Sequence, residues 1–94
     1  MSLAVDVVKK GGKRPTEPFD RDKLHRSIKA ACLSVRTPDG QAEDTARQAC
    51  DAVVMWLDNK PEVTTDDIRQ FVSNHLDKSH PEAGFIYRRH RFII

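Results

Sequence analysis

The sequence predicts a mainly α fold of the α+β class, a four-helix bundle capped by a small N-terminal β-hairpin. The first residues alternate in polarity up to a two-glycine turn, and four later segments repeat apolar residues at helical spacing. Short connections between those segments favour antiparallel packing of the helices. The 94 residues suffice for one domain with a small core, so we expect residues 1–94 to form a single unit.

The hairpin is predicted around Gly11 and Gly12, which both tolerate positive φ and therefore favour a turn. Residues 5–10 alternate before this turn and form the first strand. The return strand, at about residues 14–18, contains prolines that cannot donate to a ladder, so it should be short or at an edge. Because a hairpin alone is marginally stable, we expect it to lie on the bundle as a lid.

The first two helices are predicted over about residues 21–35 and 41–58. Asp20 is a suitable N-cap for the first, and the Thr-Pro-Asp-Gly segment at 37–40 separates it from the second. Each helix has one apolar stripe that indicates its buried face. The stripes are Leu24, Ile28, Ala31 and Val35 on the first helix, and Ala42, Ala46, Ala49, Val53 and Trp56 on the second.

The third helix is predicted to begin at Thr64, which can cap it, with Asp67 completing a capping box. The fourth is predicted to begin in the Ser-His-Pro-Glu segment at 79–82, with its proline in the first turn. The inward faces are Ile68, Phe71, Val72 and Leu76 on the third helix, and Ala83, Ile86, Tyr87 and His90 on the fourth.

The charge distribution indicates an anion site rather than a nucleic-acid surface. The net charge is +2, but residues 1–29 carry eight Lys/Arg against four acids, residues 30–79 five against nine, and residues 80–94 three against one. If the fold brings the two positive ends together, they form a local anion site. A nucleic-acid-binding domain usually has a larger basic excess, so we do not expect the domain itself to bind nucleic acid.

No segment predicts a membrane-spanning or secreted protein. No apolar run approaches the roughly 20 residues that a span needs, and the N-terminus has neither a basic region nor a long apolar stretch. Cys32 and Cys50 fall on apolar helix faces, which favours buried free thiols in a reducing compartment, although the sequence alone leaves a disulfide open. We therefore expect a cytoplasmic protein without membrane contact.

No pattern predicts catalysis or a metal site. The histidines, His25, His75, His80 and His90, have no ligand spacing with the two cysteines. The sequence has no nucleophile–base pair and no Gly-x4-Gly-Lys-Ser/Thr phosphate loop. We expect neither an enzyme nor a metal-binding protein, and we expect His90 to pack in the stripe of the fourth helix.

Over about residues 5–91, an ordered set of motifs resembles the ATP-cone, the nucleotide-sensing domain of ribonucleotide reductase large subunits and of the bacterial repressor of their genes. The motifs are a basic hairpin at Lys9-Lys10, a Glu-x-x-Asp cap at 17–20, a Lys-Leu helix start at 23–24, Val-Thr-Thr-Asp-Asp-Ile at 63–68 and Pro-Glu-Ala at 81–83. The resemblance implies a four-helix bundle under a hairpin cap. It also implies ATP or dATP bound beneath the cap as an effector, which Mg²⁺ can accompany, and no catalysis.

The resemblance further implies a nucleotide-binding set, namely Val7, Lys9, Lys10, Glu17, Asp20, Lys23, Leu24, Thr65, Arg69, Arg88 and Arg91. The two consecutive lysines match the pair that meets the phosphates. Glu17 and Asp20 fall where the family places a carboxylate and a polar residue on the adenine edge, and a carboxylate there rejects guanine. Lys23 and Leu24 match the basic and apolar residues that open the first helix, and Thr65 matches the hydroxyl that opens the third.

Departures from the family pattern leave some details open. Gly11 stands where the family has an aspartate. Arg69 falls where a histidine often sits in reductases, which leaves the choice between ATP and dATP open. On the fourth helix, the register allows either Arg88 or Arg91 to supply the cation near the phosphates.

The sequence leaves two other functions open. The third and fourth helices, with the Arg-Arg-His-Arg run at 88–91, can mimic a DNA-binding helix-turn-helix. Alternatively, the domain is an interaction or dimerisation module that has lost nucleotide binding, which the glycine at position 11 would fit. Taken alone, Lys9 and Lys10 are edge-strand lysines that block aggregation, and Arg69 is a solvated side chain.

The expected partners of a sensor are an adenine nucleotide and the protein that it regulates. That protein is a second copy of the chain or a reductase or repressor. The sequence contains neither reductase machinery nor the zinc ribbon of the repressor. It leaves open whether the chain is a stand-alone sensor or a regulatory piece of a longer protein.

Overall fold

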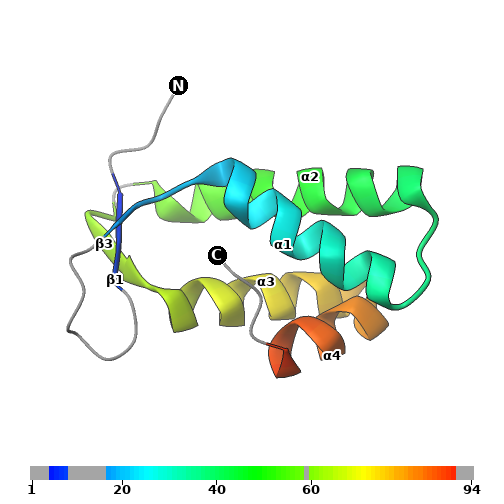
Figure 1. Ribbon diagram of the computed structural model, residues 1–94. Coiled ribbons are helices and arrows are strands. Elements are labelled where there is room, and N and C mark those ends of the chain that lie inside the picture. The colour runs from blue at the N-terminus through cyan, green and yellow to red at the C-terminus, as the bar shows by residue number, and fades with distance from the viewer. Residues whose placement is uncertain (1–4, 9–16, 59, 91–94) are drawn as a thin grey trace.

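The computed structural model describes residues 5–8, 17–58 and 60–90. Within these residues, helices form a bundle and a small sheet lies across one end of it (Figure 1). The helices are α1 (Arg21–Ser34), α2 (Asp39–Leu57), α3 (Thr65–Ser79) and α4 (Pro81–Arg89). The predicted mainly α fold is confirmed, and the predicted helix bounds agree with these to within about two residues.

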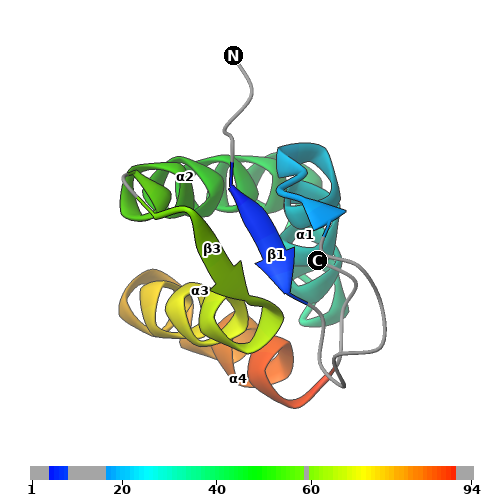
Figure 2. The same ribbon diagram turned by 90° about the vertical axis from the view of Figure 1, so that its left-hand side faces the viewer.

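The sheet contains one strand more than the predicted hairpin. Its strands are β1 (Asp6–Val8), β2 (Glu17–Pro18) and β3 (Glu62–Thr64), in the order β2-β1-β3. Strand β2 pairs antiparallel with β1, as predicted, and β3 pairs parallel with β1, as Figure 2 shows for β1 and β3. The sequence missed β3 because three residues have no periodicity of their own. The predicted turn at Gly11 and Gly12 lies outside the described residues.

The core is built from one face of each helix and the underside of the sheet. The predicted stripes are buried at their centres, whereas Val35, Trp56, Phe71 and Ile86 are partly buried at the rim. The sheet contributes Val5, Val7 and Val63. The prediction that His90 packs in the fourth stripe was wrong, because α4 ends at Arg89 and His90 is exposed with an extended backbone.

The two cysteines are buried free thiols, as predicted. Burial raises the pKa of Cys32, and it raises the pKa of Cys50 to about 11. Both thiols therefore stay protonated at neutral pH and behave as small core residues.

Alanine substitutions at Gly84 and Gly40 are expected to change the free energy of unfolding in opposite directions. A methyl group at Gly84 would overlap the Asp77 carboxylate and lie 3.1 Å from the Ser73 carbonyl oxygen, whereas one at Gly40 would meet nothing within 4 Å. We expect Gly84→Ala to lower the free energy of unfolding by about 1–2 kcal/mol, since overpacking between α3 and α4 outweighs the gain in helix propensity. We expect Gly40→Ala to raise it by up to about 1 kcal/mol. Urea denaturation of both variants checks this, and changes of equal sign would contradict it.

Candidate functional site

Two helix N-termini lie at the end of the bundle that the sheet covers, which we call the sheet end. Helices α1 and α3 both begin beside the sheet and run away from it (Figures 1 and 2). The first turn of a helix presents unpaired backbone N–H groups and the positive end of the helix dipole. This end of the bundle therefore favours negative charge, and most of the described residues in the predicted set lie here.

On the α1 side, three predicted polar residues come together from β2 and the start of the helix. Asp20 caps α1 by accepting a hydrogen bond from the Lys23 backbone N–H at 3.2 Å. The Nζ atom of Lys23 lies 3.3 Å from Oε2 of Glu17, in a pair that is partly exposed on both sides. Glu17 is opposite Val7 in the β2–β1 register, so β1 borders the same group. Partly exposed pairs of this kind contribute little to stability and can be rearranged by a ligand.

On the α3 side, the two threonines at the helix start have separate roles. Thr64 is the N-cap, and its capping box with Asp67 is confirmed, with both hydrogen bonds present. The Thr65 hydroxyl donates to the Val8 carbonyl oxygen at 3.3 Å and thereby ties α3 to β1. The hydroxyl that the resemblance assigns to the nucleotide thus lies at the seam between the sheet and α3.

Arg69 lies one turn further along α3, and its environment differs from the expected one. Its side chain is only 15% exposed, so the reading of a solvated side chain was wrong. Its Nη1 atom donates to Oδ1 of Asp66 at 2.9 Å. Its Nε atom is buried and has no hydrogen-bond partner among the described residues. A buried donor without a partner costs about 1–3 kcal/mol, so a native one needs an explanation.

The hydroxyl groups of Ser27 and Tyr87 form a buried pair near Arg69. Neither residue was among the predicted site residues. The Tyr87 and Ser27 oxygens are 2.8 Å apart, and Ser27 donates its own proton to the Leu24 carbonyl oxygen at 2.7 Å. Tyr87 must therefore be the donor to Ser27. Burial raises the pKa of Tyr87 to about 12, against the opposing effects of the Ser27 hydrogen bond and the Arg69 charge. The pair links α4 to the first turns of α1 with a neutral contact.

The two apolar members of the predicted set belong to the core. Val7 is 4% exposed and Leu24 is fully buried. They supply apolar surface below the sheet, next to the polar residues of β2 and α1. In this structure neither side chain is open to a ligand.

One predicted cation, Arg88, is not part of this group, and three others are not described by the structure. On α4, Nη2 of Arg88 pairs with Oδ2 of Asp77 at 2.6 Å. Asp77 lies eight residues beyond Arg69 on α3, about 12 Å along the helix axis. Lys9, Lys10 and Arg91 lie outside the described residues.

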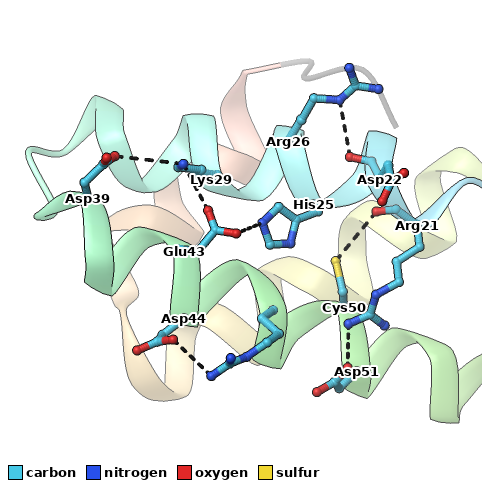
Figure 3. Close-up of polar contacts among 11 residues, drawn as sticks. Arg21, Asp22, His25, Arg26, Lys29, Asp39, Glu43, Asp44, Cys50 and Asp51 are labelled. Carbon is cyan, nitrogen blue, oxygen red and sulfur yellow. Dashed lines mark hydrogen bonds and ion pairs between the residues drawn. The ribbon is translucent and has the colours of Figure 1, made fainter.

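The charged side chains between α1 and α2 are engaged with one another (Figure 3). Glu43 lies between Lys29 and His25, at 3.0 Å from Lys29 Nζ and 2.8 Å from His25 Nε2. The hydrogen bond from Lys29, followed by that from His25, lowers the pKa of Glu43. This contact stabilises the fold above the ordinary carboxyl pKa and loses its contribution as the pH falls through the lowered value. These groups hold helices together rather than form a site.

Two features are absent from the described residues. No helix is both long and apolar enough to cross a membrane. Among the same residues, no group of three or more His, Cys, Asp and Glu side chains is placed to hold a metal ion.

The sequence profile described as the ATP cone domain matches residues 5–91. The chain is also similar to three proteins named transcriptional repressor NrdR. It is 36% identical over 91 residues to the protein from Roseiflexus castenholzii (strain DSM 13941 / HLO8). That alignment covers 93% of this chain and 57% of the relative. It is 36% identical over 90 residues to that from Roseiflexus sp. (strain RS-1), covering 92% and 57%. The protein from Chelativorans sp. (strain BNC1) is 36% identical over 91 residues, covering 90% and 55%. The chain thus spans little more than half the length of these relatives.

Proposed function

The chain belongs to the ATP-cone family, and we propose that it is a regulatory domain that binds ATP or dATP at the sheet end of its bundle. One observation carries the proposal beyond the family match. Arg69 holds a buried Nε–H without a partner among the described residues, at the same end of the bundle as the N-termini of α1 and α3. A triphosphate would supply the acceptor that this donor lacks and the negative charge that both helix ends favour.

The remaining polar residues fit the other parts of the nucleotide. Glu17 would accept a hydrogen bond from the adenine amino group, and guanine would be disfavoured because its O6 is also an acceptor. Lys23, released from Glu17, would turn to the phosphates, where Lys9 and Lys10 would join it. The Thr65 hydroxyl, at the seam between α3 and β1, would then face the ribose or a phosphate.

The affinity that this set can provide is sufficient for an effector. Each charge-assisted hydrogen bond contributes about 1.5–3 kcal/mol. A micromolar Kd corresponds to about −8 kcal/mol, so three or four such contacts and a covered base suffice. Mg²⁺ would accompany the phosphates rather than occupy a protein site of its own.

The proposed role is to sense and not to catalyse. Nucleotide binding would order the contacts among β1, β2 and the start of α1, and the changed surface would be read by a regulated protein such as a reductase or a repressor in the cytoplasm. DNA binding by this domain alone is less well supported, because Arg88 is paired with Asp77 and the Arg89 guanidinium lies over the Phe85 ring.

Calorimetric titration with ATP, dATP and GTP tests the proposal. We expect ATP and dATP to bind, GTP to bind at least tenfold more weakly, and Lys9→Ala/Lys10→Ala to weaken ATP binding at least tenfold. Lys78→Ala, on the exposed last turn of α3, is the matched control and should leave the affinity unchanged. Equal binding of GTP would contradict the role of Glu17, and equal binding by the double variant would contradict the phosphate site.

A further inference from the structure

Beyond its first turn, the solvent side of α1 is basic and contains an exposed apolar residue. Residues 23–38 contain four Lys/Arg and no Asp or Glu. Arg26, Ala30 and Leu33 share one side of the helix at the spacing i, i+4 and i+7. Arg36 follows just beyond the C-terminal end of the helix. We call these four residues the α1 face.

The centre of the α1 face is apolar. Leu33 is 44% exposed and is one of three exposed large apolar residues among the described residues. Ala30, one turn earlier, is half-buried and has only a methyl group, so the surface beside the leucine is low. An apolar side chain of a partner would therefore be buried against Leu33 without displacing a polar group of this chain.

The two arginines of the α1 face are not paired with carboxylates in the described part of the chain. The two lysines of the same stretch are paired with glutamates. Arg26 forms no ion pair with a described residue, and its side chain lies on the side of α1 away from α2 (Figure 3). Arg36 is exposed and likewise has no described carboxylate as partner. Two guanidinium groups ten residues apart, about 15 Å along the helix axis, are thus available.

Arg36 occupies a position at which the backbone favours glycine. Its φ is 63°, in the left-handed region. Its N–H donates to the Leu33 carbonyl oxygen and the Thr37 N–H to that of Cys32, a Schellman motif whose left-handed residue is usually glycine. The Thr37 hydroxyl lies 2.6 Å from Nε2 of His80, so the chain turns inward after Arg36 and leaves its side chain in solvent. The chain thus carries a guanidinium where the turn alone would favour glycine.

The charges around the α1 face favour a partner with separate carboxylates over a continuous polyanion. Helix α2 packs antiparallel along α1 and carries four Asp/Glu against one Lys/Arg. These carboxylates would repel nucleic acid, whose phosphates are closely and evenly spaced. A helix with a carboxylate at each end of an apolar stripe would instead meet both arginines and cover Leu33 on the side away from α2.

We propose that the α1 face docks an acidic amphipathic helix of a different protein, which packs along α1. An apolar residue of that helix would lie on Leu33, and its carboxylates would pair with Arg26 and Arg36. The 14 residues of α1 are about 21 Å long, so the buried area is at the low end for specific interfaces and the association is weak. The α1 face does not include the sheet-end residues, so this inference does not rest on nucleotide binding.

A synthetic helical peptide tests the docking in the absence of nucleotide. The peptide carries Glu at positions i and i+11 and Leu at i+4 and i+7 of one helix face, in an alanine background. Fluorescence anisotropy of the labelled peptide measures its affinity for the full chain. We expect wild type to bind it with a Kd below about 1 mM. Leu33→Asp and the double variant Arg26→Glu/Arg36→Glu should each weaken binding about tenfold or more.

Matched variants separate the effect of charge from that of folding. Arg36→Gly suits the left-handed backbone, so it should fold at least as well as wild type and yet bind the peptide about threefold more weakly or worse. The double variant Arg26→Glu/Arg36→Glu should bind a peptide with Lys in place of Glu, which wild type should not bind. Lys78→Glu, at an exposed cation of α3, is the control and should leave the affinity unchanged.

Several results would overturn this proposal. Absence of peptide binding at millimolar wild type would do so, as would equal binding of the Glu and Lys peptides. Duplex DNA that bound more tightly than the peptide would assign the two arginines to nucleic acid instead. Self-association that the double variant abolishes, measured by sedimentation without peptide, would assign the α1 face to a second copy. The four residues lie outside the buried core, so the variants should fold, and far-UV circular dichroism verifies this.

Discussion

Replacing Tyr87 by alanine is expected to lower the free energy of unfolding by about 3–5 kcal/mol, the cost of truncating a fully buried aromatic residue. A domain of this size has a total stability of about 5–15 kcal/mol, and each kcal/mol moves its Tm by about 4–8 °C. The Tyr87→Ala variant should therefore be marginally folded at room temperature. Thermal and urea denaturation measure the loss.

Tyr87→Phe separates packing from the hydrogen bond and is the matched control. It keeps the ring and removes the hydroxyl that donates to Ser27, so we expect a loss of about 1 kcal/mol. If both variants lost the same stability, the ring would not be packed in the core as the structure places it.

The hydroxyl also makes a defined contribution to the alkaline pH dependence. Burial raises the pKa of Tyr87 from its ordinary value near 10 to about 12. The unfolded chain then loses this proton first, so the contribution is present below pH 10 and is lost as the pH rises toward 12. Tyr87 is the only tyrosine in the sequence, so tyrosinate absorbance follows it alone. The stability advantage of wild type over Tyr87→Phe should shrink over this range and then reverse.

Replacing Arg69 by methionine is expected to weaken ATP binding by about 10- to 150-fold, which corresponds to one charge-assisted hydrogen bond of about 1.5–3 kcal/mol. The same variant should unfold at an equal or higher denaturant concentration. It removes a buried cation whose Nε has no partner among the described residues, and a well-packed apolar side chain is often at least as stable there. Calorimetric titration and urea denaturation of one preparation measure both quantities.

Arg88→Met is the control for this prediction. Arg88 is half exposed and paired with Asp77, about 12 Å along α3 from Arg69, so its removal should leave ATP affinity within about twofold of wild type. Normal ATP binding by Arg69→Met, or a loss of affinity that arises only because the variant is unfolded, would contradict a role of Arg69 in the site.

The sequence determines the helices well because their signals are local. The stripe on α1, the Asp20 cap and the Thr64–Asp67 capping box each depend on residues within one or two turns, and each is confirmed. The family resemblance was visible for the same reason, since most of its motifs lie at the starts of these helices. The phosphate-binding role of Lys9 and Lys10 stays a prediction, because both residues lie outside the described residues.

The features that could not be predicted from the sequence depend on contacts between segments that are distant in the chain. Strand β3 exists because β1 offers it a free edge, and the Ser27–Tyr87 pair joins residues 60 positions apart. Arg69 was expected to be solvated because charged residues usually are, and only the packing of α3 against the rest of the bundle buries it. The position of Ser27 on the buried side of α1, one turn after Leu24, was the available signal for a buried hydroxyl.

Amide chemical-shift mapping during an ATP titration shows where on the bundle the nucleotide binds. We predict the largest shifts at the sheet end, at Val7, Glu17, Lys23, Thr65 and Arg69, with little change in the α1–α2 connection or at the start of α4. Shifts gathered at the opposite end of the bundle, or none at saturating ATP, would contradict a nucleotide site at the sheet end.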